Sequence, residues 1–201
     1  MELPLKLNRE FYKQPLLDLA RKLPGKLLVK STGSELLAGK IVEVEAYDGA
    51  TDESAHSFNG KTPRTEVMFK EGGYLYVYLS YGVHYCCNIV TGNKDEGTAI
   101  LIRALEPVIG IDQMAINRFG KDQISVKEKL NLTSGPGKLC KSMGIVKGDN
   151  GTDLVKGEIY LTESFETNQP GIVQTTRIGI SKAKELPWRF YIKDNPYVSR
   201  K

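Results

Sequence analysis

Residues 74–80 alternate strictly between two kinds of side chain, and this pattern constrains the fold more than any other feature of the sequence. The backbone of a β-strand points successive side chains to opposite faces. Three tyrosines therefore share one face and three aliphatic residues share the other: Tyr74, Tyr76 and Tyr78, against Leu75, Val77 and Leu79. Residues 83–90 are predicted to form a second strand, and Tyr81-Gly82 between the two strands predicts a β-hairpin. The aliphatic face can pack in a core, which leaves the tyrosine face for another contact.

A longer segment, residues 36–47, has the same period of two. Val42, Val44 and Ala46 are expected to face a core, while two carboxylates and a phenol share the opposite face: Glu43, Glu45 and Tyr47. Further strands are predicted at 26–30 and 98–105 and near 158–162, 176–180 and 188–192, and helices at 14–23, 108–119 and 137–143. Residues 48–72 are polar and rich in turn-forming residues, and a segment of this length within a compact domain is usually functional.

The length and composition fit a single globular domain. Of the 201 residues, 40% are hydrophobic and 26% are charged, so disordered and fibrous proteins are excluded. No apolar run approaches the roughly 18 residues that span a bilayer. We therefore expect residues 1–201 to form one mixed α/β (α+β) domain with a curved, largely antiparallel sheet, surrounding helices and a protruding β-hairpin.

Charge and cysteine content constrain the partners and the compartment. The 28 Lys and Arg outnumber the 24 Asp and Glu, for a net charge of +4, and the excess lies in residues 121–201, which hold 14 basic and 9 acidic side chains. A partner that carries phosphates would therefore meet mainly the C-terminal part of the chain. Three cysteines without a CxxC motif, and a start without a secretory signal, indicate the cytoplasm and no thiolate zinc site.

Tyr81 has a different setting from the neighbouring tyrosines. Five of the ten tyrosines lie within residues 74–85. An aromatic ladder is an ordinary feature of a strand, but a face of phenols also suits stacking on planar ligands such as nucleobases. Tyr81 lies beside Gly82 at the expected hairpin tip, where an aromatic side chain contributes little to folding. Chance exposure and a role as a stacking wedge are both consistent with this position.

Glu45 and Arg103 are the candidates for acid–base chemistry. Glu43 and Glu45 could each be solvated strand residues, but Glu45 shares its face with Tyr47 and precedes the polar loop that contains His56. A carboxylate near a phenol and an imidazole can activate water or stabilise a developing cation. Arg103 lies within an otherwise apolar strand, so it must be paired or line a polar cavity. We expect it to face the same site as Glu45.

Other motifs admit both a functional and a structural explanation. The spacing of Asp52, Glu53 and His56 could hold a metal ion, although a hydrogen-bonding loop histidine explains the same residues. Lys138 follows Ser134-Gly135-Pro136-Gly137, a helix start that could grip a DNA phosphate or could simply cap the helix. The sequence contains no Gly-x-Ser-x-Gly, Walker or dinucleotide-binding motif.

A series of short motifs occurs in an order that is specific to one family. The motifs are Glu45-Ala46-Tyr47, Ala55-His56-Ser57, Thr62-Pro63-Arg64, Met68-Phe69, Leu75-Tyr76-Val77-Tyr78, Tyr81-Gly82, Asn88, Leu101-Ile102-Arg103-Ala104-Leu105-Glu106-Pro107 and Ser134-Gly135-Pro136. With them the chain strongly resembles the alkyladenine (3-methyladenine) DNA glycosylases of the mammalian type, which also occur in bacteria. The resemblance extends from about Phe11 to Ser199, nearly the whole chain.

The resemblance implies a base-excision DNA repair enzyme that acts as a monomer on damaged double-stranded DNA. Such enzymes flip an alkylated or deaminated purine out of the duplex and hydrolyse its N-glycosidic bond. The lesions would include 3-methyladenine, 7-methylguanine, hypoxanthine and ethenoadenine. By resemblance Glu45 is the general base, and Arg103 helps to hold the attacking water. The other implied roles are a base pocket of Tyr47, His56, Tyr78 and Asn88 (the last excluding normal guanine), intercalation by Tyr81, and further DNA contacts from Tyr76, Gly82, Val83 and Lys138. No metal or cofactor is expected.

The chemistry of alkylated purines agrees with these roles. Alkylation at N3 or N7 makes the base cationic, so it stacks well on phenol faces and leaves easily. Ionised Glu45 could stabilise the oxocarbenium-like sugar and deprotonate water. Neutral hypoxanthine would need protonation to leave. Because water rather than a lysine amine attacks, we expect a monofunctional enzyme that leaves an abasic site without lyase activity.

Two residues depart from the family pattern, and two other functions stay open. Val83 replaces a bulkier wedging side chain and His84 replaces an aromatic one, and both changes could alter how the hairpin enters DNA. The chain starts close to the family core, which favours a bacterial source. The alternatives are a damage-recognition or single-strand-binding module that uses the tyrosines without catalysis, and a metal-dependent hydrolase built on Asp52, Glu53 and His56.

Overall fold

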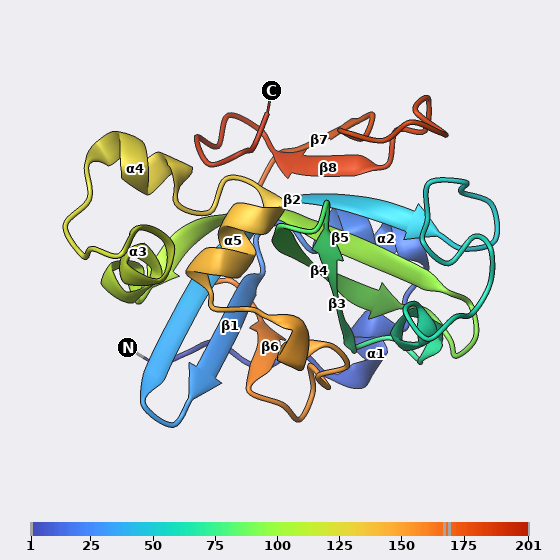
Figure 1. The fold of residues 1–201 in the computed structure, drawn as a ribbon, viewed down its shortest axis with the longest axis horizontal. Coiled ribbons are helices and arrows are strands. Elements are labelled where there is room, and N and C mark those ends of the chain that lie inside the picture. Colours follow the sequence, from blue (N-terminus) through green and yellow to red (C-terminus); the bar gives the residue numbers. More distant parts are fainter. Residues whose placement is uncertain (1, 167, 169, 201) are drawn as a thin grey trace.

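An antiparallel β-sheet organises the part of the chain that the computed structural model describes, which is residues 2–166, 168 and 170–200. The strands are β1 (Leu27–Thr32), β2 (Glu35–Asp48), β3 (Leu75–Ser80), β4 (His84–Thr91), β5 (Thr98–Ile109), β6 (Ile159–Thr162), β7 (Ile172–Thr175) and β8 (Arg189–Ile192). The helices are α1 (Arg9–Tyr12), α2 (Leu16–Lys22), α3 (Ile111–Phe119), α4 (Val126–Asn131) and α5 (Pro136–Ser142), with 3₁₀ turns η1 (Glu66–Phe69) and η2 (Lys147–Asp149). The sheet is curved and helices surround it (Figure 1), so the expected mixed α/β class is confirmed.

The long strand β2 lies at the centre of the sheet. The strand order is β3-β4-β5-β2-β1-β6, and β8 joins beside β2 and carries β7. β2 pairs with β5 along most of its length, with β1 through its first part, and with β8 over Glu43–Glu45. The stretch of β2 that carries both carboxylates is therefore hydrogen-bonded on both edges, which holds its backbone firmly in place.

The packing of the hydrophobic core confirms most of the predicted alternation of aliphatic and tyrosine side chains between the two faces of β3. Leu75 and Val77 join one large buried cluster that also contains apolar side chains of α2, α3 and α5. On the opposite face Tyr76 packs under η1, against Val67 and Met68. The tyrosine face is therefore partly covered by the 3₁₀ turn, and Leu79, at the end of the strand, is exposed.

A β-bulge in β2 corrects one predicted face. The register with β5 shifts on both sides of Glu43, and an extra residue of this kind changes the face that its neighbours occupy. Val44 and Ala46 lie in the main core as expected. Val42 instead packs in a separate cluster with Ala104, on the side of the C-terminal segment. The predicted alternation of buried faces therefore holds for Val44 and Ala46 and fails at Val42.

The helix predictions are correct in position and less so in extent. The predicted helices at 14–23 and 137–143 correspond to α2 and α5, and Pro136 occupies the first turn of α5. The third begins later than predicted, because Val108 and Ile109 extend β5 and Gly110 then turns with φ 74°. A Cβ at Gly110 would lie 2.7 Å from the backbone oxygen of Leu36, so this turn requires glycine. The short helices α1 and α4 were not predicted.

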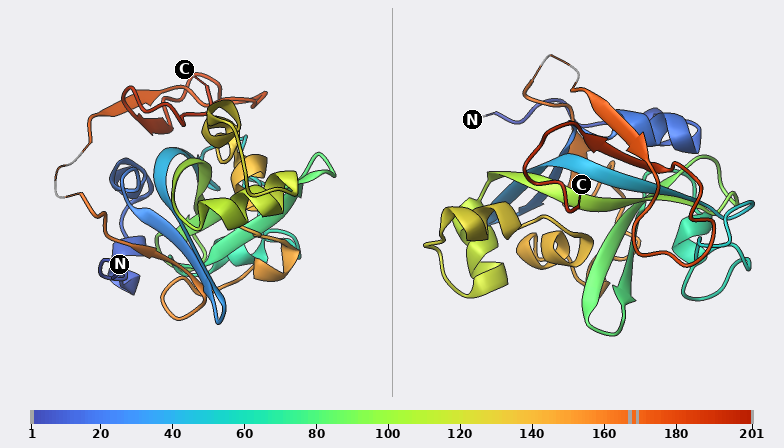
Figure 2. Two further views of the ribbon diagram at one scale, coloured as in Figure 1. Left: turned by 90° about the vertical axis from the view of Figure 1, so that its left-hand side faces the viewer. Right: turned by 90° about the horizontal axis from the view of Figure 1, so that it is seen from above.

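The hairpin β3–β4 projects from the body of the molecule, as both turned views show (Figure 2). Its register ends at Ser80 opposite His84, and Tyr81 and Gly82 form the turn with φ values of 50° and 71°. The predicted protruding hairpin is thus confirmed. Among the described residues, no helix has the length and apolar character that crossing a membrane requires.

The strand predicted at 176–180 is wrong. The chain forms β7 four residues earlier, over Ile172–Thr175, and residues 176–180 are irregular. The physical reason is that this segment directs its polar groups inward. Arg177 forms a buried ion pair with Asp52, and the backbone N–H of Ile178 donates to Glu45, so these groups bind side chains instead of a neighbouring strand.

Candidate active site

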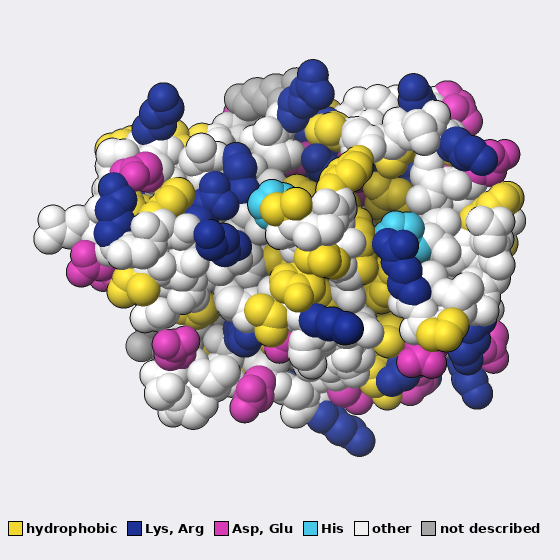
Figure 3. Space-filling model, viewed as in Figure 1, with side chains coloured by type: hydrophobic (Ala, Val, Ile, Leu, Met, Phe, Trp, Pro, Cys, Tyr) yellow, Lys and Arg dark blue, Asp and Glu magenta, His cyan; other side chains and the backbone are white. Residues whose placement is uncertain are grey.

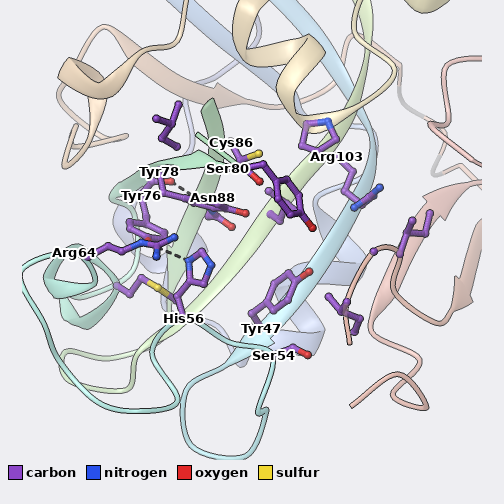
Figure 4. Close-up of a pocket in the computed structure, with 18 residues that line it drawn as sticks. Tyr47, Ser54, His56, Arg64, Tyr76, Tyr78, Ser80, Cys86, Asn88 and Arg103 are labelled. Atoms are coloured by element: carbon purple, nitrogen blue, oxygen red, sulfur yellow. Dashed lines mark hydrogen bonds between the residues drawn. The ribbon is translucent and has the colours of Figure 1, made fainter. Parts of the chain in front are cut away.

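A cavity of about 470 Å³ opens beside the hairpin and gathers most of the predicted site residues (Figure 4). Tyr47 and Arg103 lie on the side of β2 and β5, and His56 and Tyr78 lie on the side of β3. The lining residues that the sequence singled out are Tyr47, His56, Tyr76, Tyr78, Tyr81, Asn88 and Arg103. Strands, a loop and the hairpin turn that are far apart in sequence thus converge on one cavity.

Aromatic rings form one wall of this cavity. The rings of Tyr76 and Tyr78 stack with centroids 5.6 Å apart, and the His56 ring meets Tyr78 edge-on with centroids 4.5 Å apart. The Tyr76 hydroxyl and the Nδ1 atom of His56 are hydrogen-bonded at 3.1 Å. Burial raises the pKa of Tyr78, so its phenol stays neutral. A planar ligand would therefore meet rigid aromatic surface without a negative charge.

His56 is neutral at physiological pH in this setting. Partial burial against the tyrosines, followed by the nearby Arg64 guanidinium, lowers the pKa of His56 to about 4. An uncharged imidazole does not repel a cationic ligand, and it can donate or accept one hydrogen bond at each nitrogen according to its tautomer. The wall is thus compatible with a positively charged aromatic base.

Glu45 lies directly behind the cavity and is completely buried. Its Oε2 atom accepts hydrogen bonds from the Tyr47 hydroxyl at 2.9 Å and from Nη1 of Arg103 at 3.2 Å. Its Oε1 atom accepts from the backbone N–H of Ile178 at 2.7 Å. Burial and the Glu45 charge raise the pKa of Tyr47, so the phenol remains a donor. Glu45 does not itself line the cavity, but Tyr47, Arg103 and Ile178, which bind it, do.

Arg103 is shared between two buried carboxylates. Its Nε atom donates to Oε1 of Glu43 at 3.2 Å, and its Nη1 atom donates to Glu45 at the same distance. Burial lowers the pKa of Arg103, but the charges of Glu45 and Glu43 outweigh it, and the net effect raises that pKa. The expectation that Arg103 and Glu45 meet at one site is confirmed. The prediction did not anticipate that Glu43 is buried at the same guanidinium.

The sequence reasoning missed a second buried ion pair beside Glu45. Arg177 and Asp52 are both buried, and Nη2 of Arg177 donates to Oδ1 of Asp52 at 2.9 Å. The Arg177 guanidinium also lies 4.7 Å from the centre of the Tyr47 ring and donates to the Ala46 carbonyl oxygen at 3.0 Å. The signal was available, because an arginine in an apparent apolar strand must find a partner, as at Arg103.

The metal hypothesis for the loop is not supported by the geometry. Asp52 is occupied by Arg177, and the Glu53 carboxylate pairs with Lys182 at 3.0 Å. His56 turns instead to the tyrosines. No group of three potential ligands is found among residues 2–166, 168 and 170–200.

The hairpin tip contrasts with the cavity in being almost fully exposed. Tyr81 is 92% exposed and Val83 is 69% exposed. Figure 3 shows apolar side chains gathered over the middle of this face, with Lys and Arg on either side. A Cβ at Gly137 would lie 2.8 Å from Cβ of His84, so α5 approaches the hairpin closely at the last strand pair before the turn, because Gly137 has no side chain. Helix α5 therefore packs against the hairpin next to its turn, while the side chains of Tyr81 and Val83 remain exposed.

The remaining predicted residues occupy three different settings. Asn88 is buried at the cavity, and its Nδ2 atom donates to the Tyr76 carbonyl oxygen at 3.2 Å. Tyr76 is only 1% exposed, so only a ligand inside the cavity can reach it. Lys138 is not part of the cavity lining; it hydrogen-bonds to Asn131, and Pro136 is the residue of α5 that lines the cavity.

Comparison with known proteins agrees with this geometry. Residues 10–196 match the family model described as methylpurine-DNA glycosylase. This chain belongs to that family. It is 48% identical to a Clostridium botulinum protein over 97% of this chain and 99% of the relative, and 50% identical to an Alkaliphilus oremlandii protein over 98% and 100%. Both relatives bear the name "Putative 3-methyladenine DNA glycosylase". The family resemblance expected from the short motifs is confirmed, and with it a DNA glycosylase of DNA repair.

Proposed function

We propose that the chain excises alkylated and deaminated purines from double-stranded DNA by hydrolysis of the N-glycosidic bond. Glu45 carries this proposal: it is a buried carboxylate that Arg103, Tyr47 and the Ile178 N–H hold beside an aromatic cavity. The lesion class is that of 3-methyladenine, the base in the names of the relatives, together with 7-methylguanine, hypoxanthine and ethenoadenine. Such bases must leave the helix to reach a cavity of this kind.

The cavity suits the flipped base. Tyr47 offers one phenol face, and His56 with Tyr78 offers a second aromatic surface across the cavity. A cationic alkylpurine gains cation–π attraction from electron-rich rings. Because His56 is neutral, its ring does not oppose the positive charge of the base; the positive charge in this wall is that of Arg64, whose guanidinium lies 5.7 Å from the centre of the Tyr78 ring. Asn88 lies at the same cavity and would reject the exocyclic amino group of normal guanine.

Glu45 and Arg103 would act on water at the edge of the cavity. As the base departs, positive charge develops on the sugar, and a fixed carboxylate stabilises that charge without reorganisation. The attacking water is held by Arg103, transfers its proton to Glu45, and forms the new bond to the sugar carbon as the bond to the base breaks. No lysine is found among the described residues that line the cavity, which supports a monofunctional enzyme whose product is an abasic site.

Tyr81 would take the place of the flipped nucleotide in the duplex. An exposed aromatic side chain on a protruding turn can enter the minor groove and fill the vacated stack. Gly82, Val83 and Lys138 would add contacts beside it. We propose that the enzyme acts as a monomer, as the family resemblance implies.

A direct excision assay tests the proposal. A duplex with a single hypoxanthine or 7-methylguanine is incubated with excess protein in EDTA, and released base and abasic sites are measured. We expect free base and strand breaks that appear only after alkali treatment. Breaks that appear without alkali would contradict the monofunctional mechanism. Binding without release of any lesion base would favour the alternative, a recognition module without catalysis.

A further inference from the structure

Glu43 is a second buried carboxylate in the active-site region, and nothing in the proposed chemistry uses it. It is 0% exposed and does not line the cavity. Its Oε1 atom accepts hydrogen bonds from Nε of Arg103 at 3.2 Å and from Nε of Arg189 at 2.7 Å. Its Oε2 atom accepts from the backbone N–H of Ser199 at 2.7 Å. A buried carboxylate is costly unless several donors satisfy it, and here three do.

The position of Glu43 makes Arg103 a bridge between two negative charges. One edge of the guanidinium binds Glu43 and the other binds Glu45, at equal distances of 3.2 Å. Each carboxylate therefore draws on a positive charge that it must share. If Glu43 lost its charge, Arg103 would be free to pair with Glu45 alone, and Glu45 would become a weaker base.

We propose that Glu43 is a positioning residue that keeps Glu45 basic by binding the far side of Arg103, with Arg189 and the Ser199 N–H as its anchors. The inference rests on the proposed role of Glu45 in excision. Through these contacts the C-terminal segment, which follows β8, becomes part of the support of the catalytic group.

The charges around Glu45 define the expected direction of change. Arg103 on β5 and Tyr47 on β2 bind it directly, and Arg177 lies in the segment that supplies the Ile178 N–H. Behind these groups lie further charged residues, which are Glu43 on β2, Asp52 in the loop after β2, and Arg189 on β8. The three arginines balance the three carboxylates. Removing one charge therefore leaves a net field at Glu45 whose sign is known.

The test compares pH–rate profiles for single-turnover release of 7-methylguanine. This base is already cationic, so the acid limb of the profile reports the enzyme and not protonation of the base. In Glu43→Gln, which keeps the shape of the side chain, we expect the acid limb to move about one pH unit lower. We also expect the plateau rate to fall about threefold to tenfold. Affinity for the lesion duplex should stay within about twofold of wild type, because Glu43 does not touch the cavity.

Three further variants separate this role from a merely structural one. Glu43→Asp keeps the charge, and its acid limb should stay at the wild-type position. Arg189→Gln removes a positive charge behind Glu43, so its acid limb should move to higher pH, opposite to Glu43→Gln. Glu106→Gln is the control: this carboxylate also contacts the C-terminal segment, through Asn195 at 2.8 Å, but its ion pair is with Lys40 and not with Arg103. Its profile should match wild type.

The outcomes separate this inference from the proposed function. If wild type excises the lesion and Glu45→Gln does not, the function stands. Acid limbs of Glu43→Gln and Arg189→Gln that superimpose on wild type, or that move in the same direction, then overturn the role of Glu43 alone. Arg189→Gln decides the question even if Glu43→Gln does not fold. Failure of the wild-type protein to release any lesion base overturns the proposed function itself.

Discussion

The buried charge network behind the cavity and the tip of the hairpin differ most in their exposure to solvent. The network holds three carboxylates and three arginines, none of them more than 9% exposed: Glu43, Glu45, Asp52, Arg103, Arg177 and Arg189. The tip presents Tyr81 at 92% exposure. Chemistry on a developing charge benefits from fixed, dry dipoles, whereas entry into a duplex requires an apolar side chain that is accessible. The comparison predicts that the two regions fail in different ways when mutated.

Glu45→Gln should have the largest effect on excision. A small effect would contradict the contrast between the buried network and the exposed tip. Glutamine keeps the shape and can still accept hydrogen bonds, but it cannot take a proton from water. We expect single-turnover excision to fall by about a thousandfold or more, with lesion binding retained. Base release from a lesion duplex measures the first quantity and a binding titration measures the second. Glu35→Gln, at the exposed start of the same strand, is the matched control and should behave as wild type.

Removing Asp52 should show that the network also holds the fold. Asp52→Ala leaves the Arg177 guanidinium buried without its partner, and we expect the free energy of unfolding to fall by about 3 kcal/mol. The neighbouring Glu53→Ala breaks an ion pair whose side chains are both more than half exposed, so the loss should be below about 1 kcal/mol. Urea unfolding of the two variants makes this comparison. Equal losses would mean that burial does not set the importance of the pair.

Tyr81→Ala should affect DNA affinity and not stability. The side chain contacts little of the protein, so the melting temperature should not change. Loss of stacking in the duplex should weaken lesion binding by about tenfold. Tyr81→Phe retains the ring and should bind like wild type. A lower melting temperature for Tyr81→Ala would show that the tip has a structural role that its exposure does not indicate.

The smallest effect concerns His56, which belongs to the aromatic wall of the cavity. Its pKa of about 4 lies below the ordinary value of 6.5, so the unfolded chain takes up a proton first as the pH falls. The stability that neutral His56 contributes is complete above pH 6.5 and is lost as the pH falls towards 4. NMR titration of the imidazole, assigned with His84→Asn, should give a midpoint near 4. A midpoint near 6.5 would show that the aromatic wall does not desolvate the ring.

Local pattern predicted the sheet and the hairpin because their constraints lie within short segments. The alternation in β3 gave the correct core residues Leu75 and Val77, and Tyr81-Gly82 gave the turn. Pattern failed where tertiary contacts decide the backbone. The bulge at Val42 is a register shift against the distant strand β5, and the irregular course of residues 176–180 follows from partners more than a hundred residues apart in sequence, such as Arg177 and Asp52.

The sequence predicted many of the side chains that gather at the site, but not the hydrogen bonds and ion pairs between them. The rule that a buried arginine must be paired pointed from Arg103 to Glu45, and both lie together. The same rule did not reveal Glu43 as a second partner, because sequence separation does not show that one guanidinium binds both carboxylates. Arg189 and the Ser199 N–H reach Glu43 only after the C-terminal segment folds back on β2.

The central claim is that Glu45 performs the chemistry while Tyr81 helps to deliver the base, and one assay tests both parts. Single-turnover release of hypoxanthine is measured from a normal duplex and from a single-nucleotide bulge, where flipping costs less. We predict that Glu45→Gln releases no base in either context, whereas the defect of Tyr81→Ala shrinks towards wild type in the bulge. Rescue of Glu45→Gln by the bulge, or a Tyr81→Ala defect of equal size in both contexts, would contradict the account.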